Sequence, residues 1–199
     1  YGGVTNVLDD CGNGNAAIAA SLGTAAGASI DMGDGWAAGI GYEGTQGSDG
    51  LMTKEGLDAY AAQISYNSDS YGASITYAMI ETSTTAETTY WAFNGYWAPS
   101  DTGSVPSISV GYEVGDPTSG ADTEQLFVGL QWDEVGPGTL GAALGTVGGI
   151  ADGATEYYQY EAFYSYPIND GMTVTPIVYL KETSGDDETG VLVKTSFSF

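Results

Sequence analysis

The chain contains no histidine and no arginine, and its 199 residues include one cysteine and three lysines. Without histidine, the usual Ser-His-Asp and Cys-His catalytic arrangements cannot be assembled. The single cysteine, Cys11, excludes an internal disulfide. With no histidine and no second cysteine, a structural zinc site would lack its ligands. No apolar run approaches the ~18 residues that a membrane-spanning helix requires.

Basic residues are scarce, but acidic residues are not. Aspartate and glutamate number 26, which gives a formal net charge of −23. Such a surface repels the phosphates of nucleic acids, so we expect no nucleic-acid partner. It attracts cations and tolerates salt. Composition alone leaves two interpretations open, a solubilising or halophilic surface and a pore that attracts cations.

The residue pattern predicts an all-β protein. Glycine (31) and tyrosine (15) are abundant and proline (6) is scarce, and apolar and polar residues alternate with a period of two. Most of the alternating runs approach the ~9–11 residues of tilted membrane strands. The eleven predicted strands are Ala25–Met32, Trp36–Glu43, Leu57–Tyr66, Tyr71–Glu81, Thr88–Trp97, Ser107–Val114, Thr123–Asp133, Thr139–Gly148, Thr155–Tyr166, Met172–Lys181 and Gly190–Phe199.

The last predicted strand favours a membrane barrel over a soluble fold. Phe197 and Phe199 fall on one face of this strand, and a soluble protein rarely offers two such residues to water. Aromatic residues also gather near both ends of the strands, as in the two belts of a barrel. The alternative is a soluble sandwich whose aromatic residues fill a core between two sheets.

The predicted connections alternate between short turns and longer polar loops, as in outer-membrane barrels. The short set ends with the turn Asn169–Gly171, although residues 99–106 are long for this set. The longer loops are predicted at residues 44–56, 82–87, 115–122, 149–154 and 182–189.

No catalytic signature stands out, so we expect no enzyme. Asp101-Thr-Gly-Ser104 resembles the signature of aspartic proteases, but it has no second copy and is interpreted as a turn. Carboxylate pairs for glycoside hydrolysis could be drawn from Glu113, Asp133, Glu156 or Glu161. With 26 acidic residues such pairs arise by chance. We predict no catalytic residue, no metal site and no cofactor.

If the apolar faces meet lipid, the opposite faces line a lumen and set its electric field. Carboxylates outnumber lysines on these faces, which indicates a preference for cations. The predicted pore-lining residues are Glu43, Glu113, Gln125, Gln131, Asp133, Gln159, Glu161, Lys181 and Lys194.

Four segments carry a resemblance to a known family. They are Asn169-Asp-Gly-Met-Thr-Val-Thr-Pro176, Gly190-Val-Leu-Val-Lys-Thr-Ser-Phe-Ser-Phe199, Tyr90-Trp-Ala-Phe-Asn-Gly-Tyr-Trp-Ala-Pro99 and Tyr1-Gly-Gly-Val-Thr-Asn-Val7. The chain resembles cyanobacterial outer-membrane porins of the carbohydrate-selective, OprB-like family, some members of which are described as iron-uptake porins. The resemblance covers essentially the whole chain, through barrel strands rather than catalytic motifs.

The resemblance implies a transmembrane antiparallel β-barrel of about sixteen strands in the cell outer membrane, usually as a homotrimer. Family members also carry a secretory signal and an N-terminal domain that grips the cell wall. The chain would then be the C-terminal portion of one barrel domain, with residues 1–24 as a loop or constriction segment.

The implied function is passive diffusion of small hydrophilic solutes and inorganic ions, with iron or other cations and sugars as candidates. The alternatives are an acidic secreted β-sandwich that binds a ligand, and a barrel that serves as envelope scaffold or phage receptor.

Overall fold

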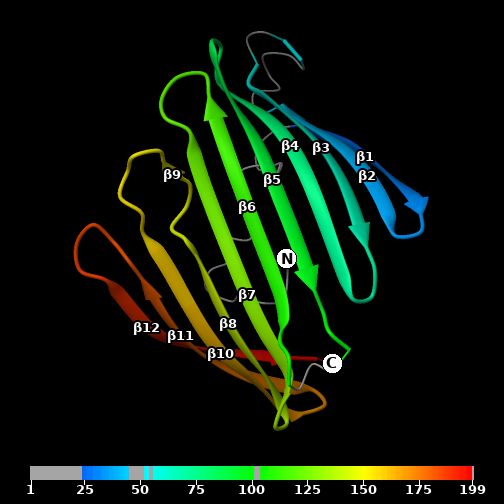
Figure 1. Cartoon of the computed structure of the whole chain (residues 1–199), viewed down its shortest axis with the longest axis vertical. Coiled ribbons are helices and arrows are strands. Elements are labelled where there is room, and N and C mark those ends of the chain that lie inside the picture. The colour runs from blue at the N-terminus through cyan, green and yellow to red at the C-terminus, as the bar shows by residue number, and fades with distance from the viewer. Residues whose placement is uncertain (1–23, 45–51, 54–55, 101–103, 199) are drawn as a thin grey trace.

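A computed structural model of the chain describes residues 24–44, 52–53, 56–100 and 104–198. These residues form a single antiparallel sheet of twelve strands, and none of them is helical (Figure 1). Accordingly, the described part holds no helix long and apolar enough to cross a membrane. The strands are β1 Thr24–Gly33, β2 Trp36–Gly44, β3 Asp58–Asn67, β4 Tyr71–Ser83, β5 Ala86–Trp97, β6 Ser107–Pro117, β7 Thr123–Val135, β8 Gly138–Thr146, β9 Ile150–Ala151, β10 Tyr158–Asn169, β11 Met172–Lys181 and β12 Glu188–Phe197.

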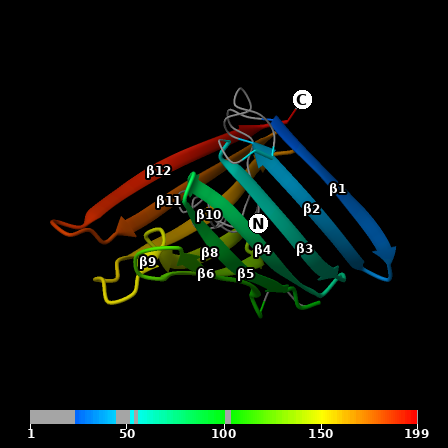
Figure 2. The ribbon, with the colours of Figure 1, turned by 90° about the horizontal axis from the view of Figure 1, so that it is seen from above.

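The strand order follows the chain. Neighbours in sequence pair from β1 to β12, except that β9 lies off this path and pairs with β7, so that β8 pairs with β10. Seen from above, the sheet curves into a trough with β1 and β12 at its two rims (Figure 2). The sheet is open, because β1 and β12 are not paired with each other. A sandwich needs two facing sheets, whereas the described strands make one.

Most predicted strands are confirmed, but the predictions for two of the longer loops were wrong. The predicted loop at residues 82–87 is a tight connection, since β4 runs to Ser83, β5 begins at Ala86, and only Thr84 and Thr85 lie between them. The predicted loop at residues 149–154 contains the extra strand β9. Several strand limits were also misplaced: β6 runs to Pro117 rather than Val114, β8 ends at Thr146 rather than Gly148, and β10 runs from Tyr158 to Asn169 rather than from Thr155 to Tyr166.

Most of the short connections lie at one end of the sheet and most of the longer loops at the other (Figure 1), except that the tight β4–β5 connection lies at the loop end and the long β5–β6 connection at the short-turn end. The β1–β2 connection shows why a two-residue turn forms there. Asp34 and Gly35 both have positive φ, 52° and 85°. Two such residues make the turn that matches the twist of a hairpin. Several predicted segments, namely residues 1–23, most of 44–56 and residues 101–103, lie outside the described residues.

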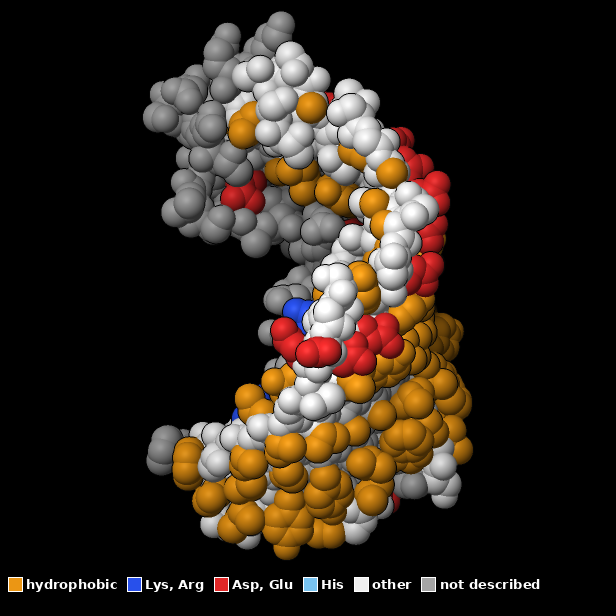
Figure 3. Space-filling view, turned by 90° about the vertical axis from the view of Figure 1, so that its left-hand side faces the viewer, with side chains coloured by type: hydrophobic (Ala, Val, Ile, Leu, Met, Phe, Trp, Pro, Cys, Tyr) orange, Lys and Arg blue, Asp and Glu red, His pale blue; other side chains and the backbone are white. Residues whose placement is uncertain are grey.

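The convex face of the sheet is apolar from one rim to the other, and Figure 3 shows its lower part as a continuous hydrophobic surface. Strand alternation explains this, because every second residue of each strand points outward. Many of these side chains are exposed, including Ile40 (67%), Val178 (53%) and Val191 (74%). Others of this face are Ile64, Ile75, Trp91, Phe93, Val110, Tyr112, Leu140, Tyr160, Tyr166, Val193 and Phe197.

Aromatic residues cluster near the short-turn end of the convex face. The rings of Trp36 and Tyr66 lie 5.1 Å apart, and those of Tyr66 and Tyr71 lie 5.7 Å apart. A second group lies toward the loop end, where the rings of Tyr42 and Tyr60 are 5.4 Å apart. The apolar surface is therefore bounded by aromatic side chains at both ends of these strands.

On the concave face, aromatic rings lie over glycines of neighbouring strands. A Cβ on Gly141 would fall 2.2 Å from the ring of Phe163, and one on Gly190 would fall 2.5 Å from that of Tyr179. A Cβ on Gly72 would likewise fall 2.4 Å from the ring of Tyr96. Each ring occupies space that any other residue would fill. This is the close approach for which a strand needs glycine.

Candidate functional site

All nine predicted pore-lining residues share the concave face. The strand register shows this directly, since paired residues lie on the same face: Glu113 pairs with Gln125, and Gln159 pairs with Lys181. Four of the nine are nearly inaccessible, with 5% of Glu43, 5% of Glu113, 7% of Gln125 and 3% of Glu161 exposed.

Six of the nine lie within about two residues of one height along the sheet. If the strands are tilted by about 40°, as they are in barrels, a level line shifts by roughly one residue for each strand crossed. The aromatic residues near the short turns calibrate this shift. The register partners of Trp36 on β2, followed from strand to strand, end at Tyr160 on β10 after seven strand steps. The aromatic residue near the short-turn end of β10 is Tyr166, six residues farther along. The level line has therefore shifted by six residues over seven strands.

The buried glutamates follow the same slope. The register from Glu43 reaches Pro117 on β6 after four steps, and Glu113 lies four residues from Pro117. Glu161 lies on β10, three strand steps beyond Glu113 on β6. The register from Glu161 leads back to Ser109 on β6, which lies four residues from Glu113.

From Glu161 the level line continues to Val178 on β11 and to Leu192 on β12, which places Lys181 farther from it than Lys194. We call the residues near this height the polar band. The polar band consists of Glu43, Glu113, Gln125, Gln159, Glu161 and Lys194.

The other three predicted residues do not join the polar band: Gln131 and Asp133 lie nearer the short-turn end, and Lys181 lies nearer the loop end. Gln131 donates a 2.6 Å hydrogen bond from its Nε2 to Oδ1 of Asp133 on the same strand. Lys181 pairs across the ladder with Gln159. All nine residues lie on one face, and their heights follow from the register, while their role as pore-lining residues stays a prediction.

Cross-strand hydrogen bonds hold other polar side chains of this face. Gln63 donates from Nε2 to Oγ1 of Thr76 at 2.8 Å, and Thr175 donates from Oγ1 to Oγ of Ser165 at 3.1 Å. Within the described residues, no buried side-chain nitrogen or oxygen lacks a partner. The concave wall therefore combines hydrogen-bonded polar side chains with the buried apolar and aromatic ones.

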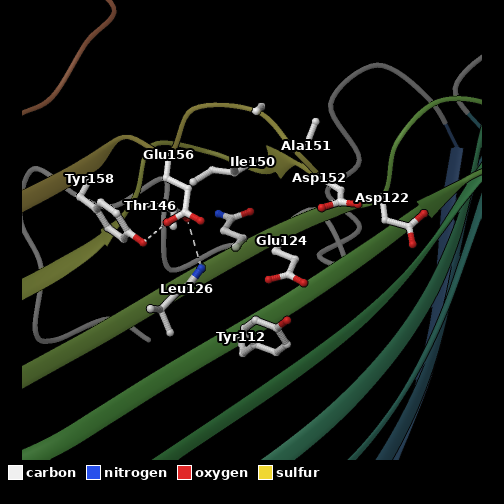
Figure 4. Close-up of a pocket in the computed structure, with 13 residues that line it drawn as sticks. Tyr112, Asp122, Glu124, Leu126, Thr146, Ile150, Ala151, Asp152, Glu156 and Tyr158 are labelled. Atoms are coloured by element: carbon white, nitrogen blue, oxygen red, sulfur yellow. Dashed lines mark hydrogen bonds between the residues drawn. The ribbon is translucent and has the colours of Figure 1, made fainter.

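Sequence reasoning missed a cavity at the loop end, between β7 and the β8–β10 connection (Figure 4). It forms because β7 changes partner. From Phe127 to Val135, β7 pairs with β8, but Thr123 and Glu124 pair with Ala151 and Ile150 of β9. The sheet therefore separates on the N-terminal side of Phe127 and leaves an open cavity of 410 Å³.

The cavity is acidic. Its lining includes four carboxylates and neither of the two described lysines, and Figure 4 shows Glu124 and Asp152 on one side and Glu156 on the other. Tyr158 donates a hydrogen bond from its hydroxyl to Glu156, and the hydroxyl of Tyr112 points toward Glu124. The full lining is Tyr112, Asp122, Glu124, Gln125, Leu126, Thr146, Ile150, Ala151, Asp152, Gly153, Ala154, Glu156 and Tyr158.

Across the described ranges, no three acidic or cysteine side chains come close enough together to hold a metal ion. No protein-family model matches the chain, and no curated protein matches it either. A functional assignment therefore depends on the geometry of the two faces.

Proposed function

We propose that the sheet is part of the wall of an outer-membrane β-barrel porin, through which small hydrophilic solutes and inorganic ions diffuse passively. The observation that carries the proposal is the contrast between the two faces. The convex face is apolar, exposed and bounded by aromatic residues, whereas the concave face holds three buried glutamates and the buried Gln125. Such a surface is unfavourable in water but suits lipid.

Barrel closure follows from the same proposal. In a membrane, unpaired backbone groups of an open edge cost several kcal/mol each, so spanning sheets close on themselves. The outer edges of β1 and β12 would therefore pair with further strands, which complete the wall. The curvature of the sheet supports closure, because it already turns the two rims toward the same side (Figure 2).

The polar band gives the proposed pore a preference for cations. Three of its six members are glutamates and one is a lysine, Lys194. Carboxylates close to a permeating ion concentrate cations and repel anions. Because salt at 1 M screens charges beyond about 3 Å, the preference should be strongest at low ionic strength.

Planar-bilayer recordings test both parts of the proposal. We expect discrete conductance steps, and a reversal potential in a KCl gradient that shows cation preference. The triple variant Glu43→Gln, Glu113→Gln and Glu161→Gln should keep the steps and move the reversal potential toward zero. Its matched control neutralises three exposed loop carboxylates, Asp69, Asp170 and Asp187, and should shift the potential much less.

The two parts fail in different ways. Absence of any conductance step from correctly folded protein would refute the porin. Steps with an unchanged reversal potential in the triple variant would refute only the role of the three glutamates.

A further inference from the structure

The two rims of the trough, β1 and β12, are open edges that can accept further strands (Figure 2). Natural sheets protect an exposed edge with proline, with lysine or with a bulge. Neither strand contains proline, and Lys194, the one lysine of the two strands, lies on the concave face. The bulge of the β1–β2 ladder lies at its turn, between Asp31 and Gly33. Both edges are therefore long and unprotected.

The direction of the strands restricts what can pair with these edges. Ten pairings lead from β1 to β12, and all ten are antiparallel. Because ten is an even number of reversals, β12 runs parallel to β1. Direct closure would therefore add one parallel pair to a sheet whose described pairs are all antiparallel, and parallel pairing is slightly less stable per residue. An entirely antiparallel wall closes only through an odd number of additional strands.

A second copy of the sheet does not satisfy this rule. If β12 of one copy lies beside β1 of the next, the pair is again parallel. If two copies meet through the same edge, β1 against β1, the pair is antiparallel, but the two-fold axis reverses one copy relative to the other. The loops of one copy would then lie level with the short turns of its partner, whereas copies inserted in one membrane share one orientation.

We propose that both edges pair with one set of antiparallel strands, odd in number, formed by the polypeptide on the N-terminal side of Thr24. The inference rests on the proposed barrel, because the membrane is what demands that the edges be paired. The order of the sheet supports this source. From β1 to β8 each strand pairs with the next one in the chain, so the strand before β1 would lie beside β1. The last strand of the set then pairs with β1, and the first strand of the set pairs with β12.

The sheet also fixes the direction of the strand that pairs with β12. β12 runs from Glu188 at the loop end to Phe197 at the short-turn end, where its register partner is Met172 beside the β10–β11 turn. An antiparallel partner starts beside Phe197 and ends beside Glu188. Its residues opposite Phe197 therefore precede those opposite Val191 in the sequence. Direct parallel pairing with β1 would give the reverse order.

Photo-crosslinking of the protein folded in lipid vesicles, with the joined peptides identified by mass spectrometry, tests the inference. One variant carries p-benzoylphenylalanine in place of Val191 and another carries it in place of Phe197, since both side chains are exposed on the convex face. We expect cross-links to β11 and to peptides N-terminal to Thr24, and the Phe197 site should reach the earlier residues of these peptides. The matched control places the same group at Val178, whose register partners are Ala162 and Val191, and should give cross-links to β10 and β12 alone.

Three results would overturn the inference. Cross-links from β12 to β1 within one chain would mean direct parallel closure. Cross-linked dimers that join β12 of one copy to β1 or β12 of another would mean that a second copy covers the edge. Cross-links from both β12 sites to β11 alone would mean that the rim has no partner. Conductance enters none of these outcomes: a cross-linked wall without channel steps refutes only the porin, and channel steps with β12 joined to β1 refute only this inference.

Discussion

A lysine in place of Val178 distinguishes lipid from water as the solvent of the convex face. Val178 lies near the middle of β11, and its neighbours in the register are Ala162 and Val191. Its side chain is 53% exposed. In water, Val178→Lys would forfeit only the buried half of the valine, about 1 kcal/mol. In a bilayer, a lysine on the lipid face near the midplane costs about 2–4 kcal/mol.

The assay is equilibrium unfolding in urea of the protein folded into lipid vesicles, followed by the fluorescence of its four tryptophans. Ser109→Lys is the matched control, since Ser109 is half-buried on the concave face and pairs with Gly129. We expect Val178→Lys to lower the free energy of unfolding by about 2–4 kcal/mol and Ser109→Lys by less than about 1 kcal/mol. An equal loss in both variants, or a wild-type protein that stays monodisperse without detergent, would refute the reasoning.

Two further predictions concern glycines and use the same unfolding measurement. Gly141→Ala should lower the free energy of unfolding by about 1–3 kcal/mol, because the new Cβ would fall 2.2 Å from the ring of Phe163. Gly39→Ala, where the nearest atom lies 3.7 Å away, should be neutral or gain up to ~1 kcal/mol, and a loss equal to that of Gly141→Ala would contradict the packing argument. Gly35→Ala should lose more than about 1 kcal/mol, because this residue has φ of +85° and its Cβ would fall 2.2 Å from the carbonyl oxygen of Asn67; an unchanged free energy would mean that the turn rearranges freely.

The faces of the strands could be predicted from the sequence because alternation is a local property. A period of two assigns each residue to a face once the strand is recognised. Glu43, Glu113 and Glu161 were therefore placed together on the polar face, although 118 residues separate the first from the last in the numbering. Their common height could not be predicted from the sequence, because it depends on the register between strands and on the tilt of the strands.

The errors at the loop end have physical causes. Thr84 and Thr85 form the β4–β5 connection without a glycine or proline to mark it, and threonine is itself a good strand residue. The short β9 exists only because Ile150 and Ala151 find free ladder positions on β7. Nothing local to residues 149–154 encodes that pairing. The cavity depends on the same long-range contact, which explains why it was missed.

The aromatic rings that lie over glycines bear on how the permeability of such a pore could be engineered. Phe163, Tyr179 and Tyr96 are already folded down against the wall, so replacing them with smaller residues would clear little of the central passage and would leave gaps above Gly141, Gly190 and Gly72. The bore would then be governed by the number of strands, which point mutations do not alter. If the proposed channel exists, its selectivity would be changed more by exchanging charges in the polar band than by shortening the bulkiest side chains of the wall.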